Sequence, residues 1–258
     1  MSTFENTVMT DIFSWIKKEP TLIGLDFDGT LVELCTDPKQ VRLREDQAGL
    51  LEKLGKLTEC AVISGRGLKD LRTYACLENL HLIGNHGCEL RLKTGGQKVW
   101  SSQNWQQWRL ERLEVLKRLV EENQGRLEDK HYSLAVHYRE AGNQQWWKTR
   151  ALEELRRTVG DQALVLDGIS ALNIVPQAAP HKGEAASELC RTLNCQRLLY
   201  FGDEPTDENV FRYASVPTLG VKVGAGQTHA KLRVDSSQDV WVLLNGILSK
   251  LQNTGRIF

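Results

Sequence analysis

Short apolar runs, each ending in a polar segment that contains glycine, constrain the fold of this chain more than any other feature of its sequence. They stand at 21–25, 60–63, 81–83, 198–201 and 218–223. Runs of this length without polar alternation are typical of strands buried on both faces of a parallel sheet. Helical patterns separate them at 43–57, 68–77, 183–193 and 207–213. This order of elements predicts an α/β fold with a doubly wound, mostly parallel sheet and helices on both of its faces.

The stretch between the third and fourth runs has a different pattern. Helices are predicted at 104–123 and about 144–158, and short strands at 125–127, 133–138, 163–166 and 171–175. Asp167-Gly168 is a turn signal of the kind that joins two strands into a hairpin. We therefore expect an α+β domain at 92–175, inserted into a core domain made of 1–91 and 176–258.

Composition and charge exclude several classes of protein. The 33 Lys and Arg residues balance the 33 Asp and Glu residues, so the basic excess of a nucleic-acid-binding protein is missing. No apolar run approaches the roughly 20 residues of a membrane-spanning helix, and Glu5 and Asp11 interrupt the segment where a secretory signal would be apolar. We expect a soluble, cytoplasmic monomer or weak dimer that binds neither membrane nor nucleic acid. The cysteines and histidines lack the spacing of a zinc site.

Reactive residues follow three of the predicted strands. Asp26 and Asp28 come after the first run, Ser64 after the second, and Asp203 and Asp207 after the fourth. The carboxyl ends of parallel strands meet at one edge of a sheet, which is where open α/β sheets bind their ligands. We therefore expect these five side chains to lie close together.

The predicted cluster has the charge pattern of a phosphoryl site. Its carboxylates would repel one another without a cation, and a set of oxygen ligands favours Mg²⁺. Lys182 stands immediately before a predicted helix, where its charge adds to the positive end of the helix dipole. An ammonium, a hydroxyl and helix-start amides beside Mg²⁺ are suited to binding a phosphoryl group.

These segments, in this order, resemble the four motifs of the haloacid-dehalogenase superfamily of phosphatases. The motifs are DFDGT at 26–30, Ser64, Lys182 and GDEPTD at 202–207. The likeness to trehalose-6-phosphate phosphatases extends along nearly the whole chain, through VISGR at 62–66, GNHGCE at 84–89, LAVHYR at 134–139, HKGEA at 181–185, FGDEPTDENVF at 201–211 and VKVGAGQT at 221–228.

The resemblance implies a reaction and a role for each residue. Asp26 would be the nucleophile that forms an aspartyl-phosphate, and Asp28 the general acid and base. The phosphoryl oxygens would be held by Thr30, Ser64, Gly65 and Lys182. Mg²⁺ would be bound by Asp26, the main-chain carbonyl of Asp28 and Asp203, with Asp207 either a further ligand or a support for the other ligands.

The resemblance also implies that the inserted domain is a mobile cap, which closes over a phosphorylated sugar. The candidates for sugar contacts are His86, Glu89, Lys130, His137, Arg139 and Asn173. The predicted reaction is the hydrolysis of trehalose 6-phosphate to trehalose and phosphate.

One departure concerns the sugar. Where these phosphatases typically carry Glu-x-Lys-Pro on the last cap strand, this chain has Asn173-Ile174-Val175-Pro176. Hydrogen bonds to charged partners contribute about 1.5–3 kcal/mol each, so their loss can change substrate choice. The alternative substrates are glucosylglycerol phosphate, mannosyl-3-phosphoglycerate and sucrose phosphate. An alternative of another class is a non-catalytic regulatory subunit that binds a sugar phosphate, although such a subunit would be expected to lack Asp26, Asp28 or Lys182.

Overall fold

The chain forms two compact units, each with its own sheet and hydrophobic core. The computed structural model describes residues 3–35, 41–100, 103–138, 141–142, 144–168 and 171–254. One unit combines Met1–Gln97 with His181–Phe258, and the other is Lys98–Pro180. We call them the core unit and the inserted unit. The inserted unit begins and ends a few residues later than the sequence patterns indicated. It begins later because two short strands after residue 88 extend the sheet of the core unit.

The sheet of the core unit is mixed but mostly parallel. Its strands, in the described part of the chain, are β1 (Thr21–Leu25), β2 (Cys60–Ile63), β3 (His81–Gly84), β4 (Glu89–Arg91), β5 (Gln97–Val99), β10 (Arg197–Gly202), β11 (Thr218–Val223) and β12 (Leu232–Val234). They lie in the order β12-β11-β10-β1-β2-β3-β4-β5, and β4 runs antiparallel to β3. The strand order changes direction at β1, which pairs in parallel with both β10 and β2. Open α/β sheets bind ligands at such a point.

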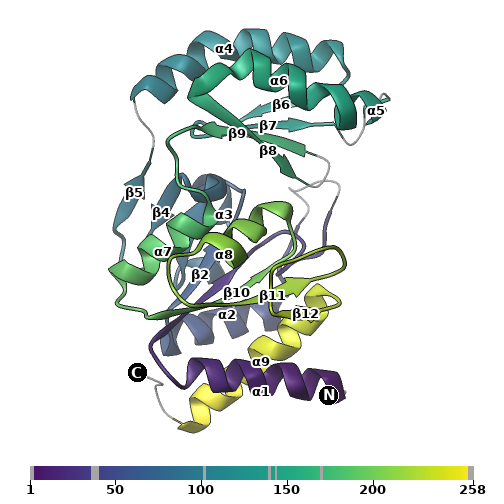
Figure 1. Ribbon diagram of the computed structural model, residues 1–258. Coiled ribbons are helices and arrows are strands. Elements are labelled where there is room, and N and C mark those ends of the chain that lie inside the picture. The colour runs from purple at the N-terminus through teal and green to yellow at the C-terminus, as the bar shows by residue number, and fades with distance from the viewer. Residues whose placement is uncertain are drawn as a thin grey trace. The chain divides into compact units, whose positions relative to one another are not determined.

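Helices cover both faces of this sheet (Figure 1). One face carries α1 (Thr3–Ile16), α2 (Glu45–Leu57) and α9 (Ser237–Thr254), which share a buried apolar cluster with alternate residues of the strands. The other carries α7 (Lys182–Thr192) and α8 (Glu208–Tyr213). The short α3 (Leu68–Leu71) packs near β3 and β4, and its leucines belong to the same apolar cluster as α1, α2 and α9. Among the described residues, no helix has both the length and the apolarity that crossing a membrane requires.

The inserted unit is an antiparallel sheet with helices on one face. Its strands β6 (Arg126–Asp129), β7 (Leu134–His137), β8 (Ala163–Gly168) and β9 (Ala171–Pro176) lie in the order β6-β7-β9-β8. The long helix α4 (Gln103–Glu122) and α6 (Leu152–Val159) pack on that face, as Figure 1 shows. Between α5 (Gln144–Trp146) and α6, residues Trp147–Ala151 form a π-helical turn.

The predicted α/β class with a separate α+β insertion is confirmed, and the five predicted core strands correspond to β1, β2, β3, β10 and β11. The helix predicted at 68–77 is wrong, since α3 ends at Leu71 and a separate 3-10 turn covers Ala75–Leu77. Asp167 and Gly168 lie inside β8, and the turn itself lies outside the described residues. Strands β4, β5 and β12 were not predicted, because runs of three residues are too short to show a period.

Gly24, in the middle of β1, tests the packing of the sheet against the α7 side. A Cβ at Gly24 would lie 2.7 Å from Cδ2 of Tyr200, so the bare backbone makes room for that ring. We expect Gly24→Ala to lower the free energy of unfolding by about 1–3 kcal/mol, the usual effect of overpacking. Gly49→Ala in α2, where a Cβ meets nothing within 4 Å, should instead raise it by about 0.5–1 kcal/mol. Urea unfolding measures both; equal effects would contradict the packing explanation.

Candidate active site

The candidate site lies at the carboxyl end of the parallel strands in the core unit. Asp26 follows β1, Ser64 follows β2, and Asp203 follows β10. Lys182 is the first residue of α7, which packs on the sheet beside β1 and β3. The start of α7 is fixed by a capping box, in which Nδ1 of His181 accepts hydrogen bonds from the main-chain N–H groups of Gly183 and Glu184.

The central contact is an ion pair in the interior of the protein. Nζ of Lys182 donates to Oδ1 of Asp26 at 2.9 Å and to Oδ1 of Asp207 at 2.8 Å, and all three side chains are buried. Oε2 of Glu204 lies 3.9 Å from the same ammonium. The hydroxyl of Tyr200 also donates to Oδ1 of Asp207, at 2.6 Å. One ammonium thus holds two carboxylates from the segments that follow two different strands, β1 and β10.

Burial, and after it the excess of negative charge, shifts the pKa values of the cluster. Burial raises the pKa of Asp26 well above its ordinary value; Lys182 opposes this shift, and the carboxylates of Asp207, Glu204 and Asp203 add to it. Burial lowers the pKa of Lys182, but Asp207 and Asp26 outweigh that effect and raise it overall. Three carboxyl groups therefore lie within 3.9 Å of the Lys182 ammonium, and a further positive charge would stabilise the cluster.

The position of Asp203 in this cluster depends on Gly29 and on the hydroxyl of Thr30. Gly29 has φ +86°, and a Cβ there would lie 2.0 Å from Oδ2 of Asp203, so only glycine allows the turn after β1 to approach so closely. The hydroxyl of Thr30 donates to Oδ1 of Asp203 at 2.9 Å. Thr30, predicted to bind phosphate, uses its proton on Asp203. Burial and the charge of Asp207 together raise the pKa of Asp203 to about 7.

The residues fit a divalent cation. Asp26, Asp203 and Asp207 each offer a carboxylate oxygen, and these oxygens lie within 4.8 Å of one another. Oδ2 of Asp26 is buried and has no hydrogen-bond partner among the described residues. An unsatisfied buried carboxylate oxygen is costly, and a hard cation is the partner that such an oxygen suits. Asp207 already binds Lys182, Tyr200 and the main-chain N–H of Glu204, so Asp26 and Asp203 are the more available ligands.

Asp28 does not join this cluster. Its two carboxylate oxygens accept hydrogen bonds from Arg66, which comes just after Ser64 and Gly65. The turn after β2 is therefore tied to the turn after β1 by a salt bridge between side chains 38 residues apart in the chain.

The turn after β2 is supported from behind by the segment that follows β3. The ring of His86 lies against Gly65, since a Cβ on that glycine would be 2.5 Å from it. The main-chain N–H of His86 donates to the carbonyl of Ser64 at 3.1 Å. Glu89 accepts hydrogen bonds from the side chain of Asn85 and from the main chain at the start of α3. His86 and Glu89, predicted to bind sugar, are both buried behind this turn.

The other sugar candidates belong to the inserted unit. His137 on β7 and Asn173 on β9 alternate with Val136 and Ile174, which pack against the helices, so both lie on the opposite face of the sheet. Nε2 of His137 lies 2.6 Å from Oε2 of Glu128 on β6, and the hydrogen bond from His137 lowers the pKa of Glu128 to about 2. Lys130 follows β6. Arg139 lies outside the described residues.

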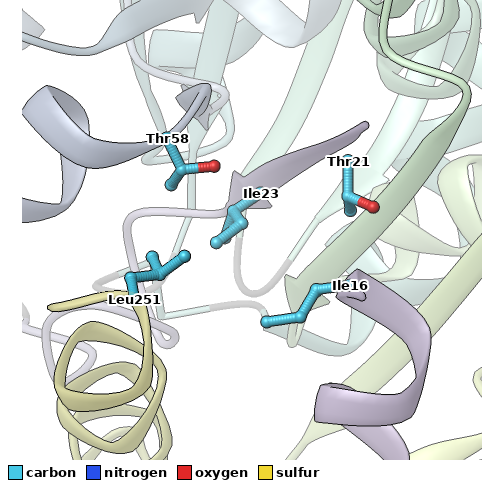
Figure 2. Close-up of a pocket in the computed structure, with 5 residues that line it drawn as sticks. All are labelled: Ile16, Thr21, Ile23, Thr58 and Leu251. Atoms are coloured by element: carbon cyan, nitrogen blue, oxygen red, sulfur yellow. The ribbon is translucent and has the colours of Figure 1, made fainter. Parts of the chain in front are cut away.

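A small cavity exists at the other end of β1 (Figure 2). It is lined by Ile16, Thr21, Ile23, Thr58 and Leu251, and its volume is about 10 Å³. A space of this size holds at most about one water molecule. It lies by the start of β1, whereas Asp26 follows the end of that strand, so it plays no part in the candidate site.

Comparison with known proteins shows which family this chain belongs to. The sequence profile of the family described as Trehalose-phosphatase matches residues 24–238, a span that includes every candidate residue of the core unit. The chain belongs to the trehalose-phosphatase family. The resemblance to haloacid-dehalogenase phosphatases is thereby confirmed at the level of the family.

Relatives within the trehalose-phosphatase family are distant. Probable trehalose-phosphate phosphatase E of Arabidopsis thaliana is 26% identical over 278 residues, covering 93% of this chain and 78% of the relative. The bifunctional trehalose-6-phosphate synthase/phosphatase of Thermoproteus tenax is 30% identical over 236 residues, covering 88% of this chain and 32% of the relative. The chain spans 61% of the length of probable trehalose-phosphate phosphatase 4 of rice. It therefore corresponds to part of several longer relatives.

Solved structures share the fold. The C-terminal domain of Candida albicans trehalose-6-phosphate phosphatase superposes with a TM-score of 0.80 at 21% identity, covering 95% of this chain and 96% of that one. A trehalose-6-phosphate phosphatase related protein gives 0.71 at 25% identity, covering 90% and 100%. The same fold is found in the C-terminal domain of the Candida albicans trehalose synthase regulatory protein, with a TM-score of 0.72 at 14% identity.

Two candidate residues were not predicted from the sequence. Arg66 stands in the same turn as Ser64, and its position at the end of β2 was the available signal. Glu128 on β6 pairs in register with Ala135 on β7, and Ala135 pairs in turn with Asn173 on β9. An acidic residue on a short exposed strand gives no signal by itself, because most such residues are solvated.

The raised pKa of Asp203 predicts how metal binding depends on pH. A cation binds the ionised carboxylate, so we expect Mg²⁺ affinity to rise with pH through about 7 and to fall by roughly tenfold per pH unit below it for each proton displaced. Calorimetric titration with Mg²⁺ between pH 6 and 8, in buffers of different ionisation enthalpy, measures both affinity and proton release. Asp203→Asn should weaken binding and flatten this dependence; an affinity that is constant across the range would contradict the assignment.

Proposed function

We propose that this chain is a Mg²⁺-dependent sugar-phosphate phosphatase, and that trehalose 6-phosphate is its substrate. The observation that carries the proposal is the buried Lys182 ammonium between Asp26 and Asp207, with Asp203 beside them, in a chain of the trehalose-phosphatase family. A nucleophile, a cation site and a fixed positive charge are the three things that phosphoryl transfer through an aspartate requires.

In this proposal Asp26 attacks the phosphorus of the sugar phosphate. A bond forms between a carboxylate oxygen of Asp26 and phosphorus, and the bond from phosphorus to the sugar oxygen breaks. Lys182 holds Oδ1 of Asp26 in place through its hydrogen bond of 2.9 Å, which orients the carboxylate before the substrate arrives. Mg²⁺, when bound by Asp26, Asp203 and the main-chain carbonyl of Asp28, offsets the negative charge that would otherwise repel the phosphate.

Asp28 moves the protons in both halves of the reaction. It first donates a proton to the departing sugar oxygen, which leaves as the free hydroxyl. It then accepts a proton from the water that attacks the aspartyl-phosphate, and phosphate and free Asp26 result. Ser64 is proposed to hold a phosphoryl oxygen with its hydroxyl, and Gly65 with its main-chain N–H.

The inserted unit is proposed to act as the cap that binds the sugar. The face of its sheet away from the helices carries Glu128, His137 and Asn173, and Lys130 follows β6. Carboxylate, imidazole and amide groups match the hydrogen-bonding capacity of sugar hydroxyls. Once it has closed over the bound sugar, a cap of this kind excludes bulk water from the phosphoryl group.

Two alternatives have a specific observation behind them. Asn173 and Val175 replace the charged pair typical of the family, which favours another glycoside phosphate such as glucosylglycerol phosphate, mannosyl-3-phosphoglycerate or sucrose phosphate. The fold shared with a trehalose synthase regulatory protein keeps a non-catalytic binding subunit as the second alternative. The buried contacts of Asp26 and Lys182 argue against it, because a subunit without chemistry has no need for a buried excess of carboxylates.

Phosphate release from a panel of sugar phosphates tests the reaction and the substrate together. We expect release that requires Mg²⁺, stops with EDTA and is fastest with trehalose 6-phosphate. A strong preference for another glycoside phosphate would contradict the proposal that trehalose 6-phosphate is the substrate, but it would still support the proposed phosphatase reaction. No release from any member, with binding of one of them intact, would favour the regulatory subunit.

Asp26→Asn tests the nucleophile. The amide keeps the size of the carboxylate but cannot form the aspartyl-phosphate, so we expect phosphate release to fall below detection while the circular dichroism spectrum and the thermal unfolding temperature show a folded protein. Asp11→Asn, on the exposed surface of α1, is the control and should leave activity unchanged. Near-wild-type activity of Asp26→Asn would assign the attack to another group.

The double variant Asn173→Glu with Val175→Lys tests which residues select the sugar. Both positions lie on one face of β9. If that face binds the sugar, the restored charges should change the kcat/KM ratio between trehalose 6-phosphate and glucose 6-phosphate by about 10-fold or more, the equivalent of one or two charged hydrogen bonds. Activity on p-nitrophenyl phosphate, which has no sugar, is the control. An unchanged ratio in a folded, active variant would mean that β9 does not select the substrate.

A further inference from the structure

The proposed reaction gives no role to Arg66, yet this side chain makes two hydrogen bonds to the carboxylate of Asp28. Nε of Arg66 donates to Oδ2 of Asp28 at 2.6 Å, and Nη2 donates to Oδ1 at 2.7 Å. Two parallel, charge-assisted hydrogen bonds between a planar guanidinium and a planar carboxylate fix both the position and the plane of the carboxylate.

Arg66 is itself held on several sides. Its Nη1 donates to Oδ2 of Asp70 at 2.8 Å, and its guanidinium carbon lies 5.1 Å from the centre of the Phe27 ring. Its main-chain N–H donates to the hydroxyl oxygen of Ser64 at 3.1 Å, and its carbonyl accepts from the N–H of Asn85 at 2.8 Å. Only 7% of the side chain is exposed, against 28% for Asp28 and 51% for Asp70. The rigid partner of the pair is therefore Arg66.

From this geometry we infer that Arg66 is a positioning residue, which holds the Asp28 carboxylate where it transfers protons to the sugar oxygen and from the attacking water. The inference rests on the proposed function. A carboxylate has about four acceptor sites, and the two hydrogen bonds from Arg66 use one on each oxygen. The remaining sites stay open to the reacting groups, so Asp28 can be held and still exchange a proton.

The need for such a partner follows from the position of Asp28. Asp28 stands two residues from the nucleophilic carboxylate of Asp26 and close to where the phosphate dianion would bind. Without Arg66, the Asp28 carboxylate would be repelled by both of these negative groups. Proton transfer requires hydrogen-bond distance to the reacting oxygen, so a side chain displaced by this repulsion is a poor catalyst. The two hydrogen bonds from the guanidinium of Arg66 keep the Asp28 carboxylate from being displaced. A lysine would supply the charge but not the two parallel bonds.

Leaving groups of different basicity distinguish positioning from the other roles of a buried arginine. A sugar alkoxide departs only with a proton from Asp28, whereas p-nitrophenolate is a weak base and departs without one. The value of kcat/KM reports the steps up to departure of the leaving group. We expect Arg66→Lys to lower kcat/KM for trehalose 6-phosphate by roughly 10- to 100-fold, a part of the roughly 10²- to 10⁴-fold that general acid catalysis contributes, and to change kcat/KM for p-nitrophenyl phosphate by less than about 3-fold.

Three further variants make the result decisive. Asp28→Asn should show the same selective loss, and the double variant Arg66→Lys with Asp28→Asn should lose no more than Asp28→Asn alone, because the two residues act as one unit. Arg44→Lys breaks a comparable bidentate pair with Asp46 on the exposed start of α2, and it should alter neither substrate. If Arg66→Lys does not fold, Asp70→Asn removes the outer anchor of Arg66 and should give a weaker loss with the same selectivity.

Each outcome has one meaning. Equal losses for the two substrates, or losses that multiply in the double variant, would overturn the inference, since phosphate binding and general stability affect both substrates alike. A selective loss in Asp28→Asn without one in Arg66→Lys would overturn the inference and keep the proposed function. If Asp28→Asn itself shows no selectivity, the proposed acid is wrong. If wild type hydrolyses another sugar phosphate instead, the same comparison applies to that substrate.

Discussion

The ammonium of Lys182, buried between the carboxylates of Asp26 and Asp207, is the contact on which the rest of the site depends. It joins residues 156 positions apart in the chain and ties the start of α7 to the ends of β1 and β10. A buried ion pair of this kind is a poor source of stability, because the desolvation of three charges offsets their attraction. Its value lies in geometry: Asp26 is oriented with one oxygen bound to Lys182 and the other left for a cation, in the way that a catalytic centre is organised before its substrate arrives.

The surrounding loops are shaped to let charged groups approach one another. Gly29 allows Asp203 to lie against the turn after β1, Gly202 leaves room for the Asp207 carboxylate, and Gly65 leaves room for the ring of His86. A side chain at any of these positions would collide with a neighbour at under 3 Å. The conformational freedom of glycine, which is unfavourable within regular elements, is used here for close packing of backbone against polar side chains. The geometry of the site therefore depends on these glycines as well as on its charged side chains.

The sequence predicted the members of the core cluster better than their roles. Asp26, Lys182, Asp203 and Asp207 were expected together because each stands at the edge of an α/β element, and parallel strands bring such edges to one place. The contacts of Thr30, with a carboxylate, and of His86 and Glu89, behind a turn, were not predictable in this way, because they depend on which neighbours fill the space around each side chain. Arg66 was not predicted as a site residue either, because an arginine in a turn is usually solvated.

What the sequence by itself determined is the class of fold, the order of the strands that carry the chemistry and the family. The fold class, the strand order and the family follow from short-range patterns, namely apolar runs of strand length, the helical period between them, and motifs of a few residues. Only the tertiary structure decided that Asp28 pairs with Arg66 instead of joining the carboxylate cluster, that His137 and Asn173 share the face of the sheet away from the helices, and that Glu128 accompanies them. Such pairings join residues that are distant in the chain, and they follow from strand register and from competition for buried hydrogen-bond partners, neither of which a local pattern records.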